Sequence, residues 1–293
     1  MSTPPVALLP DRGVVSVTGD DARGFLDNLV TNDMDLLDRQ PAIHAALLTP
    51  QGKILFAFFV VKVPDGFLLE TSRMAAADLV KRLTLYKLRA KVALNDISAS
   101  RAVVVSWGEE QPELPLALSY PDPRSVALGW RHLMAPEMAQ KLAPQDAGAA
   151  AYDRHRIGTG VPEAVRDYLL GDTFVHEANF DGQGGVSFTK GCFVGQEVVA
   201  RMQHKTVVRK RVVRVAGASP LTEGADVLVG EAVIGRIGST DGCAGLAMLR
   251  LDRALEAHGK GQVVTAAGVE LTVDRDALEA YQAAAKARAA QPT

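Results

Sequence analysis

The chain has 293 residues, 47% of them hydrophobic and 23% charged, with a formal net charge of −2. This length and composition are typical of a globular protein with two or three cores, and the near-neutral charge does not favour nucleic acid or an anionic membrane as a partner. Two cysteines, Cys192 and Cys243, form at most one disulfide, which excludes a disulfide-stapled secreted domain and favours a reducing compartment.

No stretch of the sequence has the length of a membrane-spanning helix. The longest apolar run, residues 54–61, has eight residues, whereas a bilayer needs about 20. The first six residues show neither the pattern of a secretory signal nor that of an arginine-rich transit segment. We therefore expect a cytoplasmic protein without a membrane partner.

The first 107 residues combine apolar runs typical of strands with two amphipathic stretches typical of helices. Strand patterns lie at 14–18, 43–49, 54–63, 67–71, 92–96 and 102–107. Helix patterns lie at 22–30, capped by Asp20 or Asp21, and at 74–88, with Leu79, Leu83 and Leu85 inside and a basic C-terminal end. This order predicts an α+β layer, a sheet with helices on one side.

The remainder of the chain shifts from mixed patterns to short strands. Residues 109–123 predict a loop, 127–133 a strand, 138–142 part of a helix, and 152–156 a helix that ends at Gly158. After residue 206, runs at 207–216, 226–229, 232–238, 244–250 and 262–273 are separated by glycine turns, which predicts a small antiparallel β-barrel. A helical tail at 278–290 follows.

One stretch, K-G-C-F-V-G-Q-E at residues 190–197, has the composition for thiol chemistry. Gly191 and Gly195 permit tight turns on either side of Cys192, and residues 196–205 predict a short amphipathic helix. The start of a helix and the neighbouring Lys190 both favour a thiolate. The alternative is a small buried apolar residue, the usual role of a free cysteine.

These eight residues resemble the signature of the folate-binding YgfZ family, K-G-C-aromatic-x-G-Q-E. The passages R-I-G-T-G-V-P-E at 156–163 and F-V-H-E-A-N-F-D at 174–181 also resemble that family. It is similar in fold to the aminomethyltransferase (T-protein) of the glycine cleavage system and includes a mitochondrial iron–sulfur cluster assembly factor. The resemblance implies two α+β units at about 1–100 and 101–205, a barrel at 206–275 and a helical tail at 276–293. In that fold a central channel accepts tetrahydrofolate.

The resemblance also implies the residues of the site. Cys192 is the expected functional thiol, with Lys190 as its charged neighbour. The residues expected to contact a folate-type ligand are Arg156, Asn179, Gly191, Gly195, Gln196, Glu197 and Arg201.

Two departures from the related folds bear on activity. Segment 52–58 has no carboxylate where the T-protein carries an aspartate that supports aminomethyl transfer, so we do not expect that reaction. Gly158 stands where folate-binding relatives carry a glutamate, and losing such a charged partner costs about 1.5–3 kcal/mol. Glu163 or Glu177 would have to replace it.

Several functions remain open from the sequence. The thiol could handle iron, sulfide or a cluster, or it could sense oxidation. His176, His204 and Cys243 lack the spacing of a metal site, so we expect no resident metal. We expect a tetrahydrofolate-binding accessory protein that works with the iron–sulfur assembly machinery or its client proteins. A tetrahydrofolate-dependent one-carbon transferase or demethylase, and a scaffold without a small ligand, are the alternatives.

Overall fold

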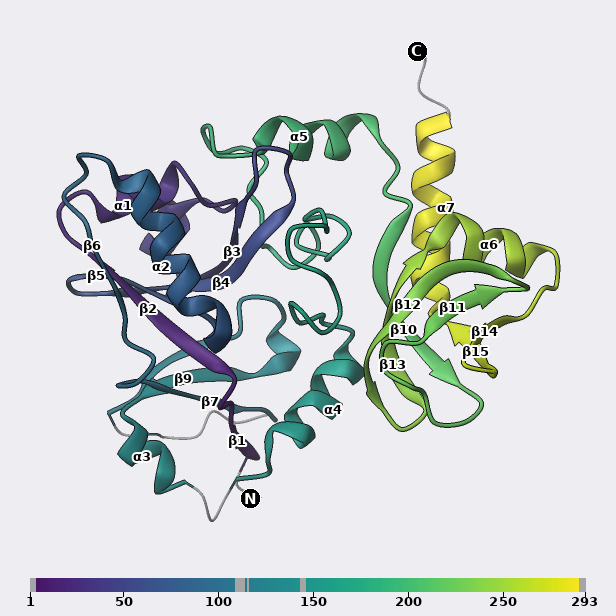
Figure 1. Ribbon diagram of the computed structural model, residues 1–293, viewed down its shortest axis with the longest axis horizontal. Coiled ribbons are helices and arrows are strands. Elements are labelled where there is room, and N and C mark those ends of the chain that lie inside the picture. The colour runs from purple at the N-terminus through teal and green to yellow at the C-terminus, as the bar shows by residue number, and fades with distance from the viewer. Residues whose placement is uncertain (1–3, 109–113, 115, 143–145, 290–293) are drawn as a thin grey trace. The chain divides into compact units, whose positions relative to one another are not determined.

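The computed structural model describes residues 4–108, 114, 116–142 and 146–289 (Figure 1). The chain divides into two compact units, each made of two segments. Unit 1 comprises Met1–Tyr152 and Phe180–Gln196, and unit 2 comprises Asp153–Asn179 and Glu197–Thr293. The segment that carries Cys192 therefore returns to the N-terminal unit, a division that differs from the boundaries expected near residues 100 and 205.

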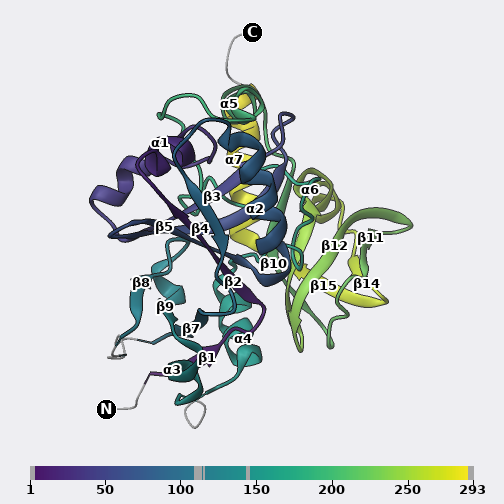
Figure 2. The same cartoon turned by 60° about the vertical axis from the view of Figure 1, so that its left-hand side comes forward.

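Unit 1 contains a five-stranded antiparallel sheet in the order β3-β4-β5-β2-β6. Its strands are β2 (Arg12–Thr18), β3 (Ala42–Leu48), β4 (Ile54–Val63), β5 (Gly66–Ser72) and β6 (Ala93–Asp96). Helix α1 (Ala22–Asp27), the 3-10 helix η1 (Met34–Asp38) and helix α2 (Arg73–Lys87) accompany it. Helix α2 packs against β2, β5 and β6, as Figures 1 and 2 show. Every residue of β3 is buried, and all of them except His44 are apolar.

A four-stranded sheet in the order β1-β7-β9-β8 completes unit 1. Its strands are β1 (Val6–Leu8), β7 (Ala102–Ser106), β8 (Leu118–Pro121) and β9 (Trp130–Met134), accompanied by η2 (Val126–Leu128) and α3 (Pro136–Gln140). Phe59 and Val61 from the first sheet share one buried cluster with Val103, Val105 and Tyr120 from the second. The two sheets of unit 1 therefore form one core. Helix α4 (Ala149–Thr159) begins at the end of this segment.

Unit 2 contains a closed barrel in the strand order β10-β13-β12-β11-β14-β15. The strands are β10 (Lys210–Gly217), β11 (Asp226–Val229), β12 (Ala232–Asp241), β13 (Ala244–Arg250), β14 (Val264–Ala266) and β15 (Val269–Val273). Helix α5 (Gln196–Lys205) precedes the barrel, α6 (Leu251–Gly259) follows β13, and α7 (Arg275–Ala289) follows β15. Pairing of β10 with β15 closes the barrel. The predicted antiparallel barrel is thus confirmed.

Some predicted elements were wrong. The run at 262–273 is a hairpin, because Ala267 and Gly268 both have positive φ, at 47° and 81°. Residues 251–259 form a helix that was not predicted. The expected loop at 109–123 contains strand β8, while residues 109–113 and 115 lie outside the described part.

Two details of the predicted helices also need correction. Leu85 is 70% exposed, so it does not belong to the inner face of α2. Helix α1 ends at Asp27, and Asp21 makes no side-chain cap there; its carboxylate accepts from the Lys91 N–H at 2.7 Å. Among the described residues, no helix combines the length and apolar character needed to cross a membrane.

Candidate functional site

The Cys192 side chain is exposed, whereas the residues that follow it are packed into unit 1. Phe193 is buried, and Val194 contacts the core cluster around the five-stranded sheet. The loop therefore turns its aromatic and aliphatic neighbours inward and leaves the thiol accessible. The alternative of a buried apolar cysteine does not hold.

Lys190 fixes this loop to the segment that follows α1. Its ammonium donates to the main-chain oxygens of Asp27 (2.5 Å), Val30 (3.1 Å) and Asn32 (2.9 Å), and to the Asp27 carboxylate (3.1 Å). The side chain is only 2% exposed. Its charge thus contacts four oxygens of the segment after α1. Any effect of this charge on the thiol stays a prediction.

Thr31 and Asn32 extend the same attachment, and sequence reasoning missed both. The Thr31 hydroxyl donates to the Gly185 carbonyl (2.7 Å), and the Thr31 carbonyl accepts from the Ser187 N–H (2.9 Å). The Asn32 amide donates to the Gly184 carbonyl (2.6 Å). Both side chains are buried. Residues 31–32 therefore hold the segment 184–187 that leads into the cysteine loop. The signal in the sequence was two adjacent polar residues directly after an apolar run.

Gly195 and Gln196 shape the end of the loop. Gly195 has φ +83°, and a Cβ there would lie 2.7 Å from the Thr49 carbonyl oxygen, so no larger residue fits without a shift. The Gln196 side chain accepts from the Phe193 N–H at 3.3 Å. Gly191, in contrast, has open space where a Cβ would be. Helix α5 then runs over the residues predicted for it, Gln196–Lys205.

The remaining expected ligand residues belong to unit 2. Arg156 is 1% exposed and donates to Asp167, to the Val161 carbonyl and to the Ser239 hydroxyl, each at 2.7 Å. The Asn179 amide donates to the Val212 carbonyl (2.8 Å), and its oxygen accepts from Arg211 (3.2 Å).

The polar atoms of Arg156 and Asn179 thus have hydrogen-bond partners within unit 2. Glu197 and Arg201, both exposed on α5, keep accessible charges. Gly158 has open space beside it and no carboxylate, and Glu177 accepts from the Phe174 N–H (2.9 Å). The folate contacts expected from the resemblance at Arg156 and Asn179 stay a prediction.

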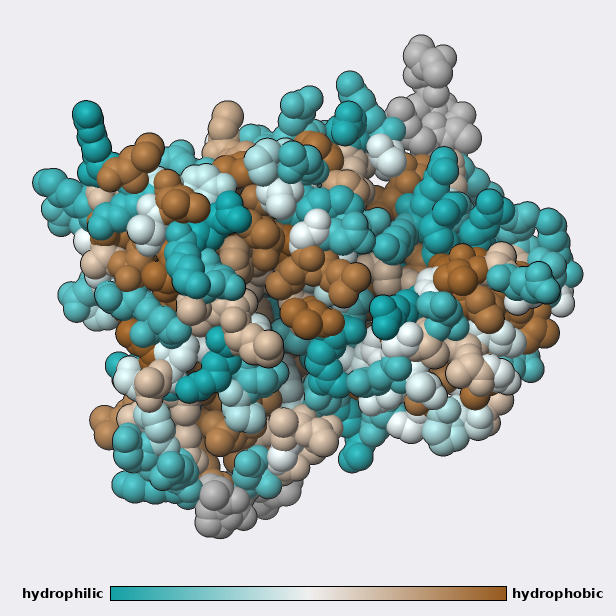
Figure 3. All heavy atoms as spheres, in the orientation of Figure 1, coloured by the Kyte–Doolittle hydropathy of each residue, from teal (hydrophilic) through white to brown (hydrophobic). Residues whose placement is uncertain are grey.

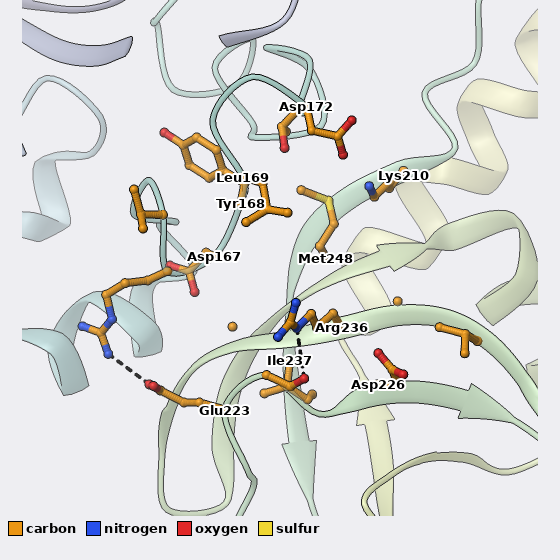
Figure 4. Close-up of a pocket in the computed structure, with 17 residues that line it drawn as sticks. Asp167, Tyr168, Leu169, Asp172, Lys210, Glu223, Asp226, Arg236, Ile237 and Met248 are labelled. Carbon is orange, nitrogen blue, oxygen red and sulfur yellow. Dashed lines mark hydrogen bonds and ion pairs between the residues drawn. The ribbon is translucent and has the colours of Figure 1, made fainter. Parts of the chain in front are cut away.

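Unit 2 also contains a cavity of about 620 Å³, drawn in Figure 4, between residues 165–173 and strands β11, β12 and β13. Tyr168, Ile237 and Met248 give it a buried apolar floor. Asp172, Lys210, Asp226 and Arg236 give it charges of both signs. An ion pair between Arg166 and Glu223 (3.0 Å) closes one side. None of the site residues expected from the sequence lines it.

The other candidates for metal ligation have separate places. Cys243 is exposed in the turn between β12 and β13, as the sequence predicted. His204 is exposed near the end of α5, while the His176 ring contacts the Gln203 amide oxygen at 3.1 Å. Within the described ranges, no three histidine, cysteine or acidic side chains gather as metal ligands would.

A buried charge network joins the two sheets of unit 1. Glu70 on β5 contacts Arg12 (2.9 Å), Arg131 and Tyr120, and Arg131 also contacts Asp122 (3.1 Å). Burial alone would raise the pKa of Asp122, but the Arg124 charge beside it lowers that pKa to about 2. These groups are buried and pair with one another, so they are not accessible to a substrate.

One histidine next to this network is held neutral. The ring nitrogens of His132 contact the hydroxyls of Ser106 (2.9 Å) and Ser119 (2.8 Å). Burial, and then the neighbouring Arg131 charge, lower the pKa of His132 to about 4.

Comparisons with known proteins show what the chain is similar to. Residues 209–278 match the family described as the CAF17 C-terminal beta-barrel domain. The chain is 33% identical over 296 residues to the mitochondrial iron–sulfur cluster assembly factor IBA57 of Homo sapiens, covering 89% of this chain and 83% of that protein. The corresponding protein of Mus musculus is 34% identical over 275 residues, covering 83% and 76%.

Other relatives are matched over a shorter part or in fold only. The IBA57 homolog of Mycosarcoma maydis is 37% identical over 230 residues, but this chain spans only 57% of its length. A crystal structure of the glycine cleavage system aminomethyltransferase T from Bartonella henselae matches with a TM-score of 0.73 at 17% identity, covering 92% of this chain and 84% of that one. The predicted T-protein-like α+β fold with a C-terminal barrel is therefore confirmed.

Proposed function

Because the chain belongs to the IBA57 family of iron–sulfur cluster assembly factors, we propose that it supports the assembly or repair of iron–sulfur clusters in client enzymes. The observation that carries this proposal is the exposed thiol of Cys192 on a loop anchored through Lys190. A thiolate is the usual protein ligand of such clusters. The cluster is cargo in this proposal, and the proposed partners are the assembly machinery or the client.

The thiol would act as a temporary ligand rather than as part of a resident site. Iron–sulfur clusters are commonly held by four cysteine thiolates. In the described part of the chain, Cys192 belongs to no group of three or more histidine, cysteine or acidic side chains that could hold a metal ion. The other ligands must therefore come from the donor or the recipient of the cluster. Since a single thiolate holds a cluster weakly, transfer onward to a client with a full ligand set is favoured.

The test compares two exposed cysteines in cells that lack the native gene. We expect Cys192→Ala to abolish rescue of [4Fe–4S] enzyme activity, and Cys243→Ala to rescue fully. Thermal unfolding of both purified variants should match the parent, since neither thiol is buried. Full rescue by Cys192→Ala would remove the thiol from the function.

The alternative role of a redox-sensing thiol gives a different result in the same cells. In that case Cys192→Ala would support client activity normally and would differ from the parent only after treatment with peroxide. We favour the cluster-assembly role of Cys192 over the redox-sensing role, because the relatives are named as iron–sulfur cluster assembly factors.

We also propose that the chain binds tetrahydrofolate, because its sequence resembles the YgfZ family. The place that we propose for it is the cavity of about 620 Å³ in unit 2, which is lined by other residues than those expected from the resemblance. Ligand cavities commonly measure about 300–1,000 Å³. In the cavity of unit 2, the Asp226 carboxylate can accept from pterin N–H groups, and the Arg236 guanidinium can pair with the glutamate tail.

Calorimetric titration with tetrahydrofolate tests this proposal. We expect heat of binding with the parent and a weaker signal with Asp226→Asn, while Asp65→Asn, at an exposed turn outside the cavity, should behave like the parent. No heat with the parent would favour a scaffold without a small ligand. We also propose the cytoplasm as the compartment, which imaging of a tagged chain would test.

A further inference from the structure

Helix α2 has an inner face that accounts for its place in unit 1. Ala76, Leu79 and Leu83 are fully buried, and their spacing of three and four residues puts them on one side of the helix. That side packs on the five-stranded sheet. The fold therefore needs nothing apolar on the opposite side.

The opposite side nevertheless carries three exposed apolar residues. Met74, Leu85 and Leu88 are 94%, 70% and 89% exposed. With Asp78 and Lys81 they form a series separated by four, three, four and three residues, which we call the outer stripe. Asp78 and Lys81 pair with each other at 3.0 Å. Alternation of three and four is the spacing of a helix that meets another helix along its length.

Leu88 adds a separate observation. It is the residue after the last turn of α2, with φ +45° and ψ −108°, a conformation that glycine adopts and a leucine does not favour. Burial of a leucine side chain normally stabilises the folded state. The Leu88 side chain is almost fully exposed, so burial does not offset the cost of its backbone conformation. Strain kept at an exposed apolar residue points to a role outside folding stability.

The charge around the outer stripe is strongly basic. Residues 73–91 contain six basic side chains and one acidic one, a net charge of +5 from 6 − 1, in a chain whose net charge is −2. Arg82 lies along one edge of the stripe, and Arg89 is the exposed residue directly after Leu88, beyond the end of the helix. The small residues Ala77 and Thr84 lie along the other edge. Figure 3, in the orientation of Figure 1, shows hydrophilic and hydrophobic side chains intermixed on the face where α2 lies.

We propose that the outer stripe of α2 docks an amphipathic helix of a partner protein, one with an apolar seam and acidic residues on one flank. Met74, Leu85 and Leu88 would enter the seam, and Arg82 and Arg89 would face the acidic flank. The small residues on the other edge permit close approach of the partner's backbone. This proposal is independent of Cys192, and its test needs neither a cluster nor folate.

The test uses the full chain and two synthetic helical peptides with leucine at the seam positions. One peptide carries glutamate and the other lysine at the flanking positions, so that like charges keep each peptide from pairing with itself. We expect fluorescence anisotropy to detect binding of the glutamate peptide only. Leu85→Gln with Leu88→Gln should weaken it by about tenfold or more. Arg82→Glu with Arg89→Glu should reverse the preference.

Two further variants separate docking from folding. Val126→Gln, at a residue 93% exposed on η2, should bind the glutamate peptide like the parent. Leu88→Gly should unfold at the same temperature or higher and still bind more weakly, because it relieves the strained φ and removes the contact. Equal binding of both peptides by the parent, or unchanged binding by the leucine variants, would overturn the proposal. So would binding confined to vesicles of phosphatidylserine and phosphatidylcholine, which would assign the face to a membrane.

Discussion

Replacing Lys190 by methionine would test whether the cysteine loop depends on one buried cation. Methionine has nearly the same length but no donor, so the three carbonyls and the carboxylate that contact the ammonium would lose it. A hydrogen bond to a charged group contributes about 1.5–3 kcal/mol. The Asp27 carboxylate is 40% exposed and can be rehydrated, whereas the lysine site is enclosed. We therefore expect a net loss of about 2–3 kcal/mol of stability in unit 1.

Tryptophan fluorescence is suited to the measurement, because both tryptophans of the chain, Trp107 and Trp130, lie in unit 1. The expected loss corresponds to a midpoint lower by about 4–12 °C. Lys205→Met is the matched control, since this lysine is exposed on α5, and it should change stability by less than about 0.5 kcal/mol. Chymotrypsin should also cleave at the buried Phe193 faster in the Lys190 variant. Equal midpoints for the two variants would refute the anchoring role.

Three other changes have defined outcomes. Gly195→Ala should destabilise unit 1 by about 1–3 kcal/mol, because of its positive φ and close backbone neighbour, whereas Gly191→Ala should unfold like the parent in the same fluorescence assay. Asp167→Asn removes the buried one of the two acids that pair with Arg156, the other being Asp153 at 3.3 Å, and should cost about 3 kcal/mol by urea unfolding; a loss below about 1 kcal/mol would contradict this. The folded-state pKa of His132, about 4, lies below its ordinary value of 6.5. As the pH falls, the unfolded chain therefore takes up a proton at this histidine before the folded chain does. Its share of stability, up to about 3 kcal/mol, is therefore present above pH 6.5 and lost between 6.5 and 4, and His132→Asn should flatten that part of the pH profile.

The sequence predicted those helices and strands whose hydrophobic pattern and end-marking residues lie within a few positions of one another. Helix α5 has the predicted bounds, because its apolar period begins directly after a glycine turn. The barrel followed from short runs separated by glycines. Strand β8 was missed because Pro121 resembles a loop residue, yet a proline is tolerated there since β8 is the edge strand of its sheet.

The site was predictable only where the chemistry is carried by the residue itself. Cys192 and the glycine at 195 could be selected from the sequence, and both have definite places in unit 1. The partners of Lys190 could not be predicted, because three of its four acceptors are main-chain oxygens. Every residue type has such an oxygen, so the sequence does not indicate which ones bind the lysine. Arg156 was expected to face a ligand, but its acid, Asp167, comes from a loop whose path the sequence did not indicate.

The attachment of the cysteine loop has a consequence for biosynthesis. Its acceptors at residues 27–32 leave the ribosome more than 150 residues before Lys190 does, as the separations of 158–163 positions require. Closing so long a connection is slow compared with forming a local helix. A nascent or truncated chain that lacks residues 180–196 therefore does not present the Cys192 thiol on unit 1. The loop takes its place only after the first segment of unit 1 has folded and the second has packed against it.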